Sequence, residues 1–166
     1  MMQLDTLRFV RIFKELDDKE LELLLPCLKP IDIEKGAYIL KEDTIGDQIF
    51  ILVKGTVRVT KDLVKGYDED VASTEKVLAT LTASILPTFG ENGILGQAPR
   101  NANVIAATDC RLYTLSKQDF DAFAISNHHA AYLIMKNIAQ VLTERLNTTD
   151  ENLVKLATAL YIAVQQ

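Results

Sequence analysis

A carboxylate and a guanidinium flank a glycine-rich run in the second half of the sequence. Glu91 precedes Arg100 by nine positions, and three glycines, Gly90, Gly93 and Gly96, lie beside or between them. Glycine lets the backbone approach a ligand closely or adopt positive φ, and a short turn of helix there would direct free N–H groups at an anion. An arginine fork pairs with phosphate oxygens, while an ionised glutamate accepts hydrogen bonds from hydroxyl groups. The run predicts a site for a ribose 3′,5′-cyclic phosphate, although the spacing alone is more often that of a solvated surface pair.

The residues around this pair form a recognisable pattern. Phe89-Gly90-Glu91 followed by Pro99-Arg100-Asn101-Ala102 resembles the phosphate-binding cassette of cyclic nucleotide-binding domains, the family that includes the bacterial catabolite activator and the regulatory subunits of protein kinase A. The resemblance implies that Glu91 binds the ribose 2′-hydroxyl, that Arg100 binds the cyclic phosphate, and that Gly90 and Gly93 contribute backbone contacts. The complete set of candidate ligand residues adds two positions for the apolar wall of the base pocket: Gly90, Glu91, Asn92, Gly93, Arg100, Asn101, Ala102, Val59 and Leu78.

The resemblance covers roughly residues 7 to 125 and implies a fold that is mainly β with flanking helices. We expect a double-stranded β-helix, or jelly roll, preceded by N-terminal helices over 1–30 and followed by C-terminal helices over 116–166. The roll itself should span 31–115 and contain the cassette at 89–102. Short β-rich runs separated by turn residues support this fold class; they lie at 38–41, 48–53, 56–61, 76–81, 103–107 and 111–115. The polar stretch between two of these runs, 61–76, is long for a hairpin and indicates a solvated, mobile loop or a partner-docking loop.

Capping residues predict where the helices begin. Leu4, Leu7, Val10 and Phe13 recur at three-residue steps and indicate a short amphipathic helix. Asp17 with Glu20 forms a capping box for a second helix. Ser116 can cap a helix that carries Phe120 and Phe123, and the two adjacent histidines, His128 and His129, are interpreted as helix-start residues rather than metal ligands, because they point in different directions.

The C-terminal stretch has almost forty residues without proline or glycine. It predicts one long helix, or two helices broken near 147–150. Its apolar residues step by three or four positions, with Thr149 filling the one wider interval, and form a seam that favours a partner: Met135, Ile138, Leu142, Leu146, Leu153, Leu156 and Leu160. We expect the first half to pack on the domain and the second half to form a homodimer. By resemblance, this helix is also the lid that moves onto the base when the phosphate is captured, with Leu142 or Arg145 as its contacts.

Three departures from the family pattern bear on the function. Asn92 stands where the family commonly has leucine, so the hydrophobic relay to the last helix is altered. Asn101 follows the cassette arginine, where a small residue is common in adenosine-type members and threonine in guanosine-selective ones. The segment 82–88 is about two residues longer than is usual. We expect a sensor of cAMP, with cGMP as the other possible ligand and no further cofactor, and the alternative is a degenerate domain that serves only as a dimerisation scaffold.

Composition restricts the other function classes. The chain of 166 residues carries a formal net charge of −5, without the basic stripe that nucleic-acid surfaces show. No apolar run approaches the 18 or so residues that span a bilayer, so a cytoplasmic, non-membrane protein is expected. No histidine, cysteine and carboxylate set has catalytic or metal-ligand spacing, which disfavours a cupin-like enzyme. No helix-turn-helix follows the long helix, which predicts a bacterial stand-alone member whose output passes to an effector protein that the sequence does not name.

Overall fold

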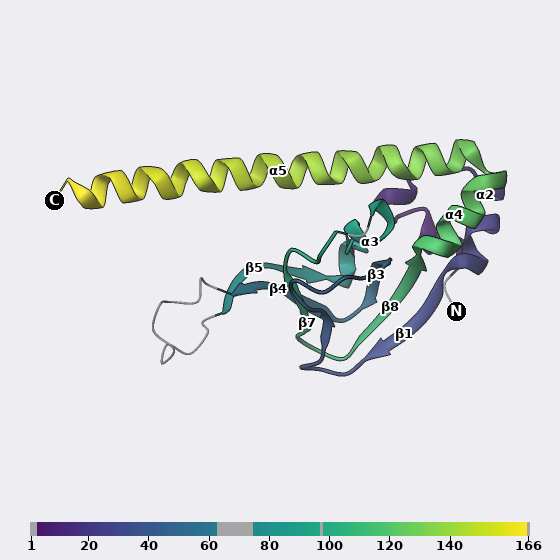
Figure 1. Ribbon diagram of the computed structural model, residues 1–166. Helices are drawn as coiled ribbons and strands as arrows, with labels where there is room; N and C mark the ends of the chain where they lie inside the picture. Colours follow the sequence, from purple (N-terminus) through teal and green to yellow (C-terminus); the bar gives the residue numbers. More distant parts are fainter. Residues whose placement is uncertain (1–2, 63–74, 97, 166) are drawn as a thin grey trace.

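The computed structural model describes residues 3–62, 75–96 and 98–165, and its centre is a pair of antiparallel sheets (Figure 1). One sheet has the strand order β1-β8-β3-β6 and the other β2-β7-β4-β5. The first comprises Lys29–Ile33, Cys110–Ser116, Gln48–Lys54 and Thr88–Phe89, and the second comprises Tyr38–Leu40, Asn103–Ala106, Thr56–Asp62 and Glu75–Thr82. The expected jelly roll with flanking helices is confirmed.

Two strands escaped the sequence prediction, β1 and β6. Strand β1 contains Pro30, which cannot donate a ladder hydrogen bond, and it lies at the edge of its sheet, where proline is tolerated. Strand β6 has only two residues, too few to show the alternation on which strand prediction depends.

Strand alternation divides the core in two. Along β3, Phe50 and Leu52 enter the cluster between the sheets, whereas Ile49 and Ile51 point to the opposite face and join the cluster under the helices. Successive side chains of a strand point to opposite faces, so a strand that is buried on both sides reads as an unbroken apolar run. Phe50 also stacks on Phe89 of the paired strand β6, with ring centroids 5.5 Å apart.

The N-terminal helices cover one end of the roll. They are α1 (Leu4–Leu7), η1 (Arg11–Phe13), α2 (Asp18–Leu24) and η2 (Leu25–Cys27). The predicted helix through 4–13 is split, because Val10 takes an extended conformation that buries it fully between α1 and η1. The capping box of Asp17 and Glu20 is confirmed in both directions.

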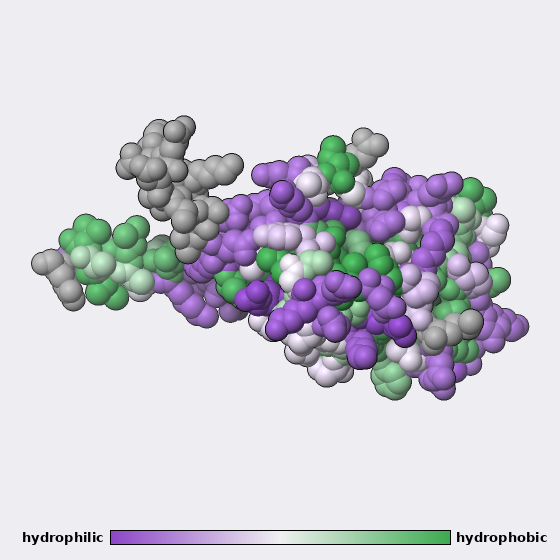
Figure 2. All heavy atoms as spheres, turned by 90° about the horizontal axis from the view of Figure 1, so that it is seen from below, coloured by the Kyte–Doolittle hydropathy of each residue, from purple (hydrophilic) through white to green (hydrophobic). Residues whose placement is uncertain are grey.

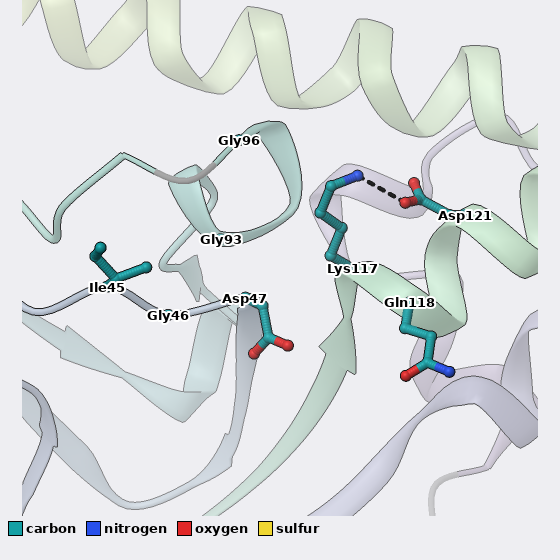
Figure 3. A pocket seen from close by; sticks show the side chains of 8 residues that line it. All are labelled: Ile45, Gly46, Asp47, Gly93, Gly96, Lys117, Gln118 and Asp121. Atoms are coloured by element: carbon teal, nitrogen blue, oxygen red, sulfur yellow. Dashed lines mark hydrogen bonds and ion pairs between the residues drawn. The ribbon is translucent and has the colours of Figure 1, made fainter.

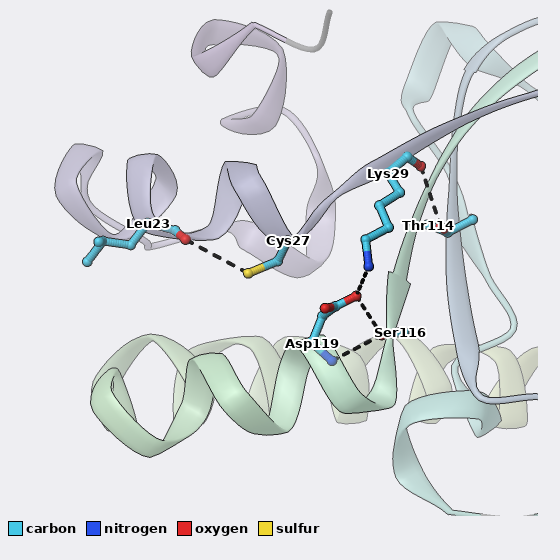
Figure 4. A network of polar contacts seen from close by, with 6 residues as sticks. All are labelled: Leu23, Cys27, Lys29, Thr114, Ser116 and Asp119. Carbon is cyan, nitrogen blue, oxygen red and sulfur yellow. Dashed lines mark hydrogen bonds and ion pairs between the residues drawn. The ribbon is translucent and has the colours of Figure 1, made fainter.

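Helix α4 (Lys117–Ser126) begins directly after β8, and a polar network fixes its start (Figure 4). The hydroxyl of Ser116 accepts from the backbone N–H of Asp119, as the cap predicts, and donates to the Asp119 carboxylate. The Lys29 ammonium of β1 donates to the same carboxylate at 2.8 Å. These contacts lower the pKa of Asp119, mainly through the Lys29 and Ser116 hydrogen bonds, and they tie α4 to both β1 and β8.

Helix α5 (His128–Val164) is continuous and begins at His128 as predicted, so the alternative of two helices is wrong. Its first half packs on η1 and α4, and its last buried residue is Val141. The second half runs past the roll (Figure 1) and is exposed from Thr143 onward in the described residues. The predicted 61–76 loop lies largely outside the described residues.

Candidate ligand-binding site

The cassette is held between strand β3 and the segment that precedes it. Residues 83–85 form the 3-10 turn η3 (Ala83–Ile85), and Leu86 follows in a left-handed conformation with φ 45°. The extra length of 82–88 is therefore absorbed by this turn before β6 pairs with β3. Gly90 then has φ 81°, a value that favours glycine, and the chain enters α3 (Asn92–Leu95).

The backbone N–H and the backbone carbonyl of Arg100 are both hydrogen-bonded to the turn that precedes β3. Its N–H donates to the Thr44 carbonyl at 2.8 Å, and its carbonyl accepts from the Asp43 N–H at 2.9 Å. Pro99 forms an isolated bridge with Ile45. The turn between β2 and β3 thus determines where the arginine side chain begins.

The guanidinium of Arg100 is buried against backbone. The residue is only 4% exposed, Nη1 donates to the Gly90 carbonyl at 2.7 Å, and Nη2 donates to the Gln48 carbonyl at 2.8 Å. An added Cβ at Gly46 would lie 2.7 Å from Nη2, so the guanidinium packs on that glycine. Among the residues that the structure describes, no carboxylate lies within ion-pair distance of it. Burial lowers the pKa of Arg100, although Asp47 and Glu91 oppose this shift from further away.

Glu91 is a buried carboxylate that is fully engaged. It is 3% exposed; Oε1 accepts from the Thr88 hydroxyl at 3.2 Å, and Oε2 accepts from Nη1 of Arg145 at 2.9 Å. Nη2 of Arg145 also donates to the Thr88 carbonyl at 2.7 Å. Arg145 belongs to α5, so the cassette and the long helix meet at this ion pair.

The remaining candidate residues range from tightly packed to exposed. Gly93 lies so close to β3 that an added Cβ would be 2.5 Å from the Gln48 backbone, and its N–H donates to the Gly90 carbonyl. Asn101 is exposed, and its carbonyl accepts from Lys61 at 3.2 Å. Asn92, Ala102 and Val59 are half-buried, whereas Leu78 on β5 is 54% exposed.

Sequence reasoning missed two contributors to the site. Gln48 acts through its carbonyl, a group that every residue has, so no sequence signal could have identified it. Thr88 precedes Phe89-Gly90-Glu91 directly, and a hydroxyl three positions before the glutamate was the available signal. Arg145 was named only by its position along the helix, and the structure brings it to Glu91 across 54 positions.

A surface hollow of about 570 Å³ lies beside the cassette (Figure 3). It is lined by Ile45, Gly46, Asp47, Gly93, Gly96, Lys117, Gln118 and Asp121. Lys117 and Asp121 pair with each other at 2.6 Å. Neither Glu91 nor Arg100 lines this hollow, although Gly46, on which the Arg100 guanidinium packs, forms part of its wall.

Two features are absent from the described residues. No group of three or more histidine, cysteine, aspartate or glutamate side chains is arranged to hold a metal ion. No helix in the same part of the chain is long and apolar enough to cross a membrane.

Comparison with known families identifies the arrangement of cassette, roll and helices. Residues 30–127 match the cyclic nucleotide-binding domain family. This chain belongs to that family. The matched segment runs from β1 to the end of α4, so it contains both sheets and the whole cassette of this cyclic nucleotide-binding domain.

Individual relatives share the domain but are longer proteins. Human cGMP-dependent protein kinase 2 is 31% identical over 116 residues, which is 69% of this chain and 14% of that protein. The cAMP-dependent protein kinase regulatory subunit of Dictyostelium discoideum is 31% identical over 112 residues, 68% of this chain and 32% of that protein. The Thermus thermophilus catabolite activator protein has the same fold, with a TM-score of 0.73 and 24% identity over 89% of this chain and 63% of that one.

Proposed function

We propose that this domain is a sensor that binds a cyclic nucleotide, preferentially cAMP, and signals through α5. The observation that carries the proposal is Arg100. Arg100 is only 4% exposed and has no carboxylate at ion-pair distance in the described residues, so folding has removed this cation from water without neutralising it. Such a charge is costly unless an anion pairs with it, and a cyclic phosphate would supply one.

The geometry supports the following roles for the candidate residues. The two carbonyls of Gly90 and Gln48 use one N–H of each terminal guanidinium nitrogen, and an arginine has five donors, so donors remain for phosphate oxygens. Glu91 is the acceptor for the ribose hydroxyl, while Gly90, Asn92, Gly93 and Ala102 shape the cassette. Because Arg100 is 4% exposed, a ligand enters only when the cassette moves away from β3 and then closes again.

The preference for one base depends on the apolar wall of the base pocket and on Asn101. Val59 and Leu78, on the paired strands β4 and β5, would form the apolar wall, and Asn101 offers both a donor and an acceptor to the ligand. The names of the relatives include both cAMP-dependent and cGMP-dependent proteins. We favour cAMP and treat cGMP as the competing ligand.

The projecting half of α5 is the proposed output and homodimer surface. Figure 2 shows hydrophobic residues gathered on this end of the molecule. Leu146, Leu153 and Leu160 are seven positions apart and are each about 60% exposed. Exposed leucines that recur every seven residues are typical of a helix that pairs with a second copy. An effector protein would then bind differently to the two positions of the paired helices.

Titration calorimetry with cAMP and with cGMP tests the binding proposal. We expect micromolar binding of cAMP, weaker binding of cGMP, and loss of both in Arg100→Ala. Arg111→Ala is the matched control, because Arg111 is an exposed arginine paired with Asp32 away from the cassette. Binding that survives in Arg100→Ala would refute the assigned role of this arginine.

A second candidate function is a scaffold that dimerises without a ligand. The specific observation in its favour is that Glu91 and Arg100 both have hydrogen-bond partners within the protein. Absence of binding heat from the wild-type protein with both nucleotides, together with a dimer in sedimentation equilibrium, would support this function instead.

A further inference from the structure

The last turns of α5 are far more apolar than the turns that lead to them. Residues 147–152 are all polar, whereas ten of the twelve residues in 153–164 are hydrophobic and only Lys155 among them carries a charge. Every residue of both stretches is exposed, and Figure 2 shows the hydrophobic group at this end of the molecule. A polar spacer, 147–152, therefore separates the domain from an exposed apolar segment, 153–164, which we call the α5 end.

Two stripes of large apolar side chains run side by side along the α5 end. The first is the leucine seam of Leu146, Leu153 and Leu160, and the second consists of Val154 and Tyr161. Each residue of the second stripe directly follows a leucine of the seam, so the two stripes are about 100° apart around the helix. Val154 is 65% exposed and Tyr161 is 64% exposed, as much as the leucines are. The helix thus offers two apolar surfaces rather than one.

Two further apolar residues join these stripes into one wide face. Ala157 lies four positions after Leu153 and three after Val154, and Val164 is placed in the same way one heptad later. Helix residues three or four positions apart are neighbours on the helix surface. A two-stranded coiled coil buries about two positions in seven, whereas a helix in the core of a bundle presents a wider apolar face. A pair formed through the leucine seam would therefore leave the second stripe in water.

The occupant that fits the second stripe is another copy of the same helix. Every copy carries both stripes, and Leu153 and Leu160 border the second stripe as well as forming the seam, so one continuous face serves both contacts. The alanines of this segment let neighbouring helices approach closely. A membrane surface fits less well, because helices that lie on it have polar faces rich in lysine and arginine, whereas the polar residues here include Asp150 and Glu151 beside Lys155.

We propose that the α5 end joins two pairs of this chain into an assembly of four, in which the leucine seam forms each pair and Val154 and Tyr161 form the contact between pairs. A pair of pairs is a common symmetric arrangement of identical chains. The polar spacer spans about 9 Å of helix, which keeps the bundle clear of the four domains. This inference goes beyond the proposed sensor function: it rests on the homodimer proposed above, but not on nucleotide binding.

Sedimentation equilibrium of the full chain over a wide range of concentration tests the assembly. The wild type should change from two chain masses in dilute solution to four in concentrated solution. Val154→Lys and Tyr161→Lys, made singly, should weaken the association of pairs more than about tenfold, because each buries a charge in the contact between them. Thr148→Lys is the matched control, since it adds the same charge to the exposed polar spacer of the same helix, and it should still reach four chain masses.

Thermal unfolding checks that the variants remain folded. Val154 and Tyr161 are exposed in the single chain, so neither substitution should lower the melting temperature of the domain. A wild type that stays at two chain masses at every concentration would overturn the inference and leave the pair intact. A wild type that stays at one chain mass would overturn the pair as well, while calorimetry with cAMP would still decide the binding proposal separately.

Two other outcomes would assign the second stripe differently. Four chain masses in both Val154→Lys and Tyr161→Lys would show that these residues do not form the contact between pairs. Flotation of the wild type with phosphatidylcholine vesicles, lost in Tyr161→Lys, would identify a lipid surface as the occupant. Either result would overturn the inference.

Discussion

Gly46→Ala is a direct test of how closely the site is built around Arg100. Gly46 lies 54 positions before Arg100 in the sequence, but its added methyl group would be 2.7 Å from Nη2, 3.0 Å from Nε and 3.2 Å from Cζ of that arginine. Gly46 has no positive φ, so the substitution adds no backbone strain. Its effect would therefore be steric and confined to the guanidinium.

The magnitude follows from the distance that the guanidinium must move. Ordinary contact with a Cβ begins at 3.4 Å, so Nη2, which would lie at 2.7 Å, has to move by about 0.7 Å. Such a movement distorts or breaks its hydrogen bond to the Gln48 carbonyl, which is 2.8 Å long. Loss of one hydrogen bond to a charged group costs about 1.5–3 kcal/mol. We expect cAMP affinity to fall roughly ten- to hundredfold, because the fork no longer points where the phosphate must lie.

Fluorescence competition with a labelled cAMP analogue, alongside thermal unfolding, would measure this effect. Gly96→Ala is the matched control, since an added Cβ there meets nothing within 4 Å and its φ of 173° is ordinary extended backbone. The control should bind normally. Wild-type affinity in Gly46→Ala, with Arg100→Ala inactive, would refute the view that the Gly46 contact fixes the guanidinium.

Three further predictions address the framework. Asp119→Asn should lower the free energy of unfolding by about 1 kcal/mol at neutral pH. Because the pKa of Asp119 is lowered in the folded state, this loss of stability should shrink as the pH falls below the ordinary value of 3.8. A loss of stability in urea titrations that does not change with pH would contradict this. Asn137→Ala should destabilise the protein by about 1–3 kcal/mol, because two carbonyls lose their buried donor; chemical denaturation measures it, and a change within error would show that water replaces the amide. Leu153→Glu should convert a dimer into a monomer in sedimentation equilibrium without lowering the melting temperature, since Leu153 is 62% exposed in the single chain; a dimer that persists would place the interface elsewhere.

Much of the framework could be predicted from the sequence because its causes are local. The short β-rich runs, the capping box at Asp17 and the cap at Ser116 each depend on residues a few positions apart, and each is confirmed. The cassette could be recognised for the same reason, since its glycines and charged residues lie within one short run. Local patterns failed where burial decided the conformation, as at Val10, which leaves the expected helix to enter the core.

The tertiary structure alone decided how the charged residues are paired. That Arg100 donates to the carbonyls of Gly90 and Gln48 depends on β3 and the cassette lying side by side, and a carbonyl has no side-chain signature that a sequence could reveal. That Arg145, rather than another residue of α5, reaches Glu91 depends on the direction in which the helix leaves the domain. The sequence by itself determined which groups are available for a nucleotide, whereas packing over long sequence separations determined which of them are already engaged.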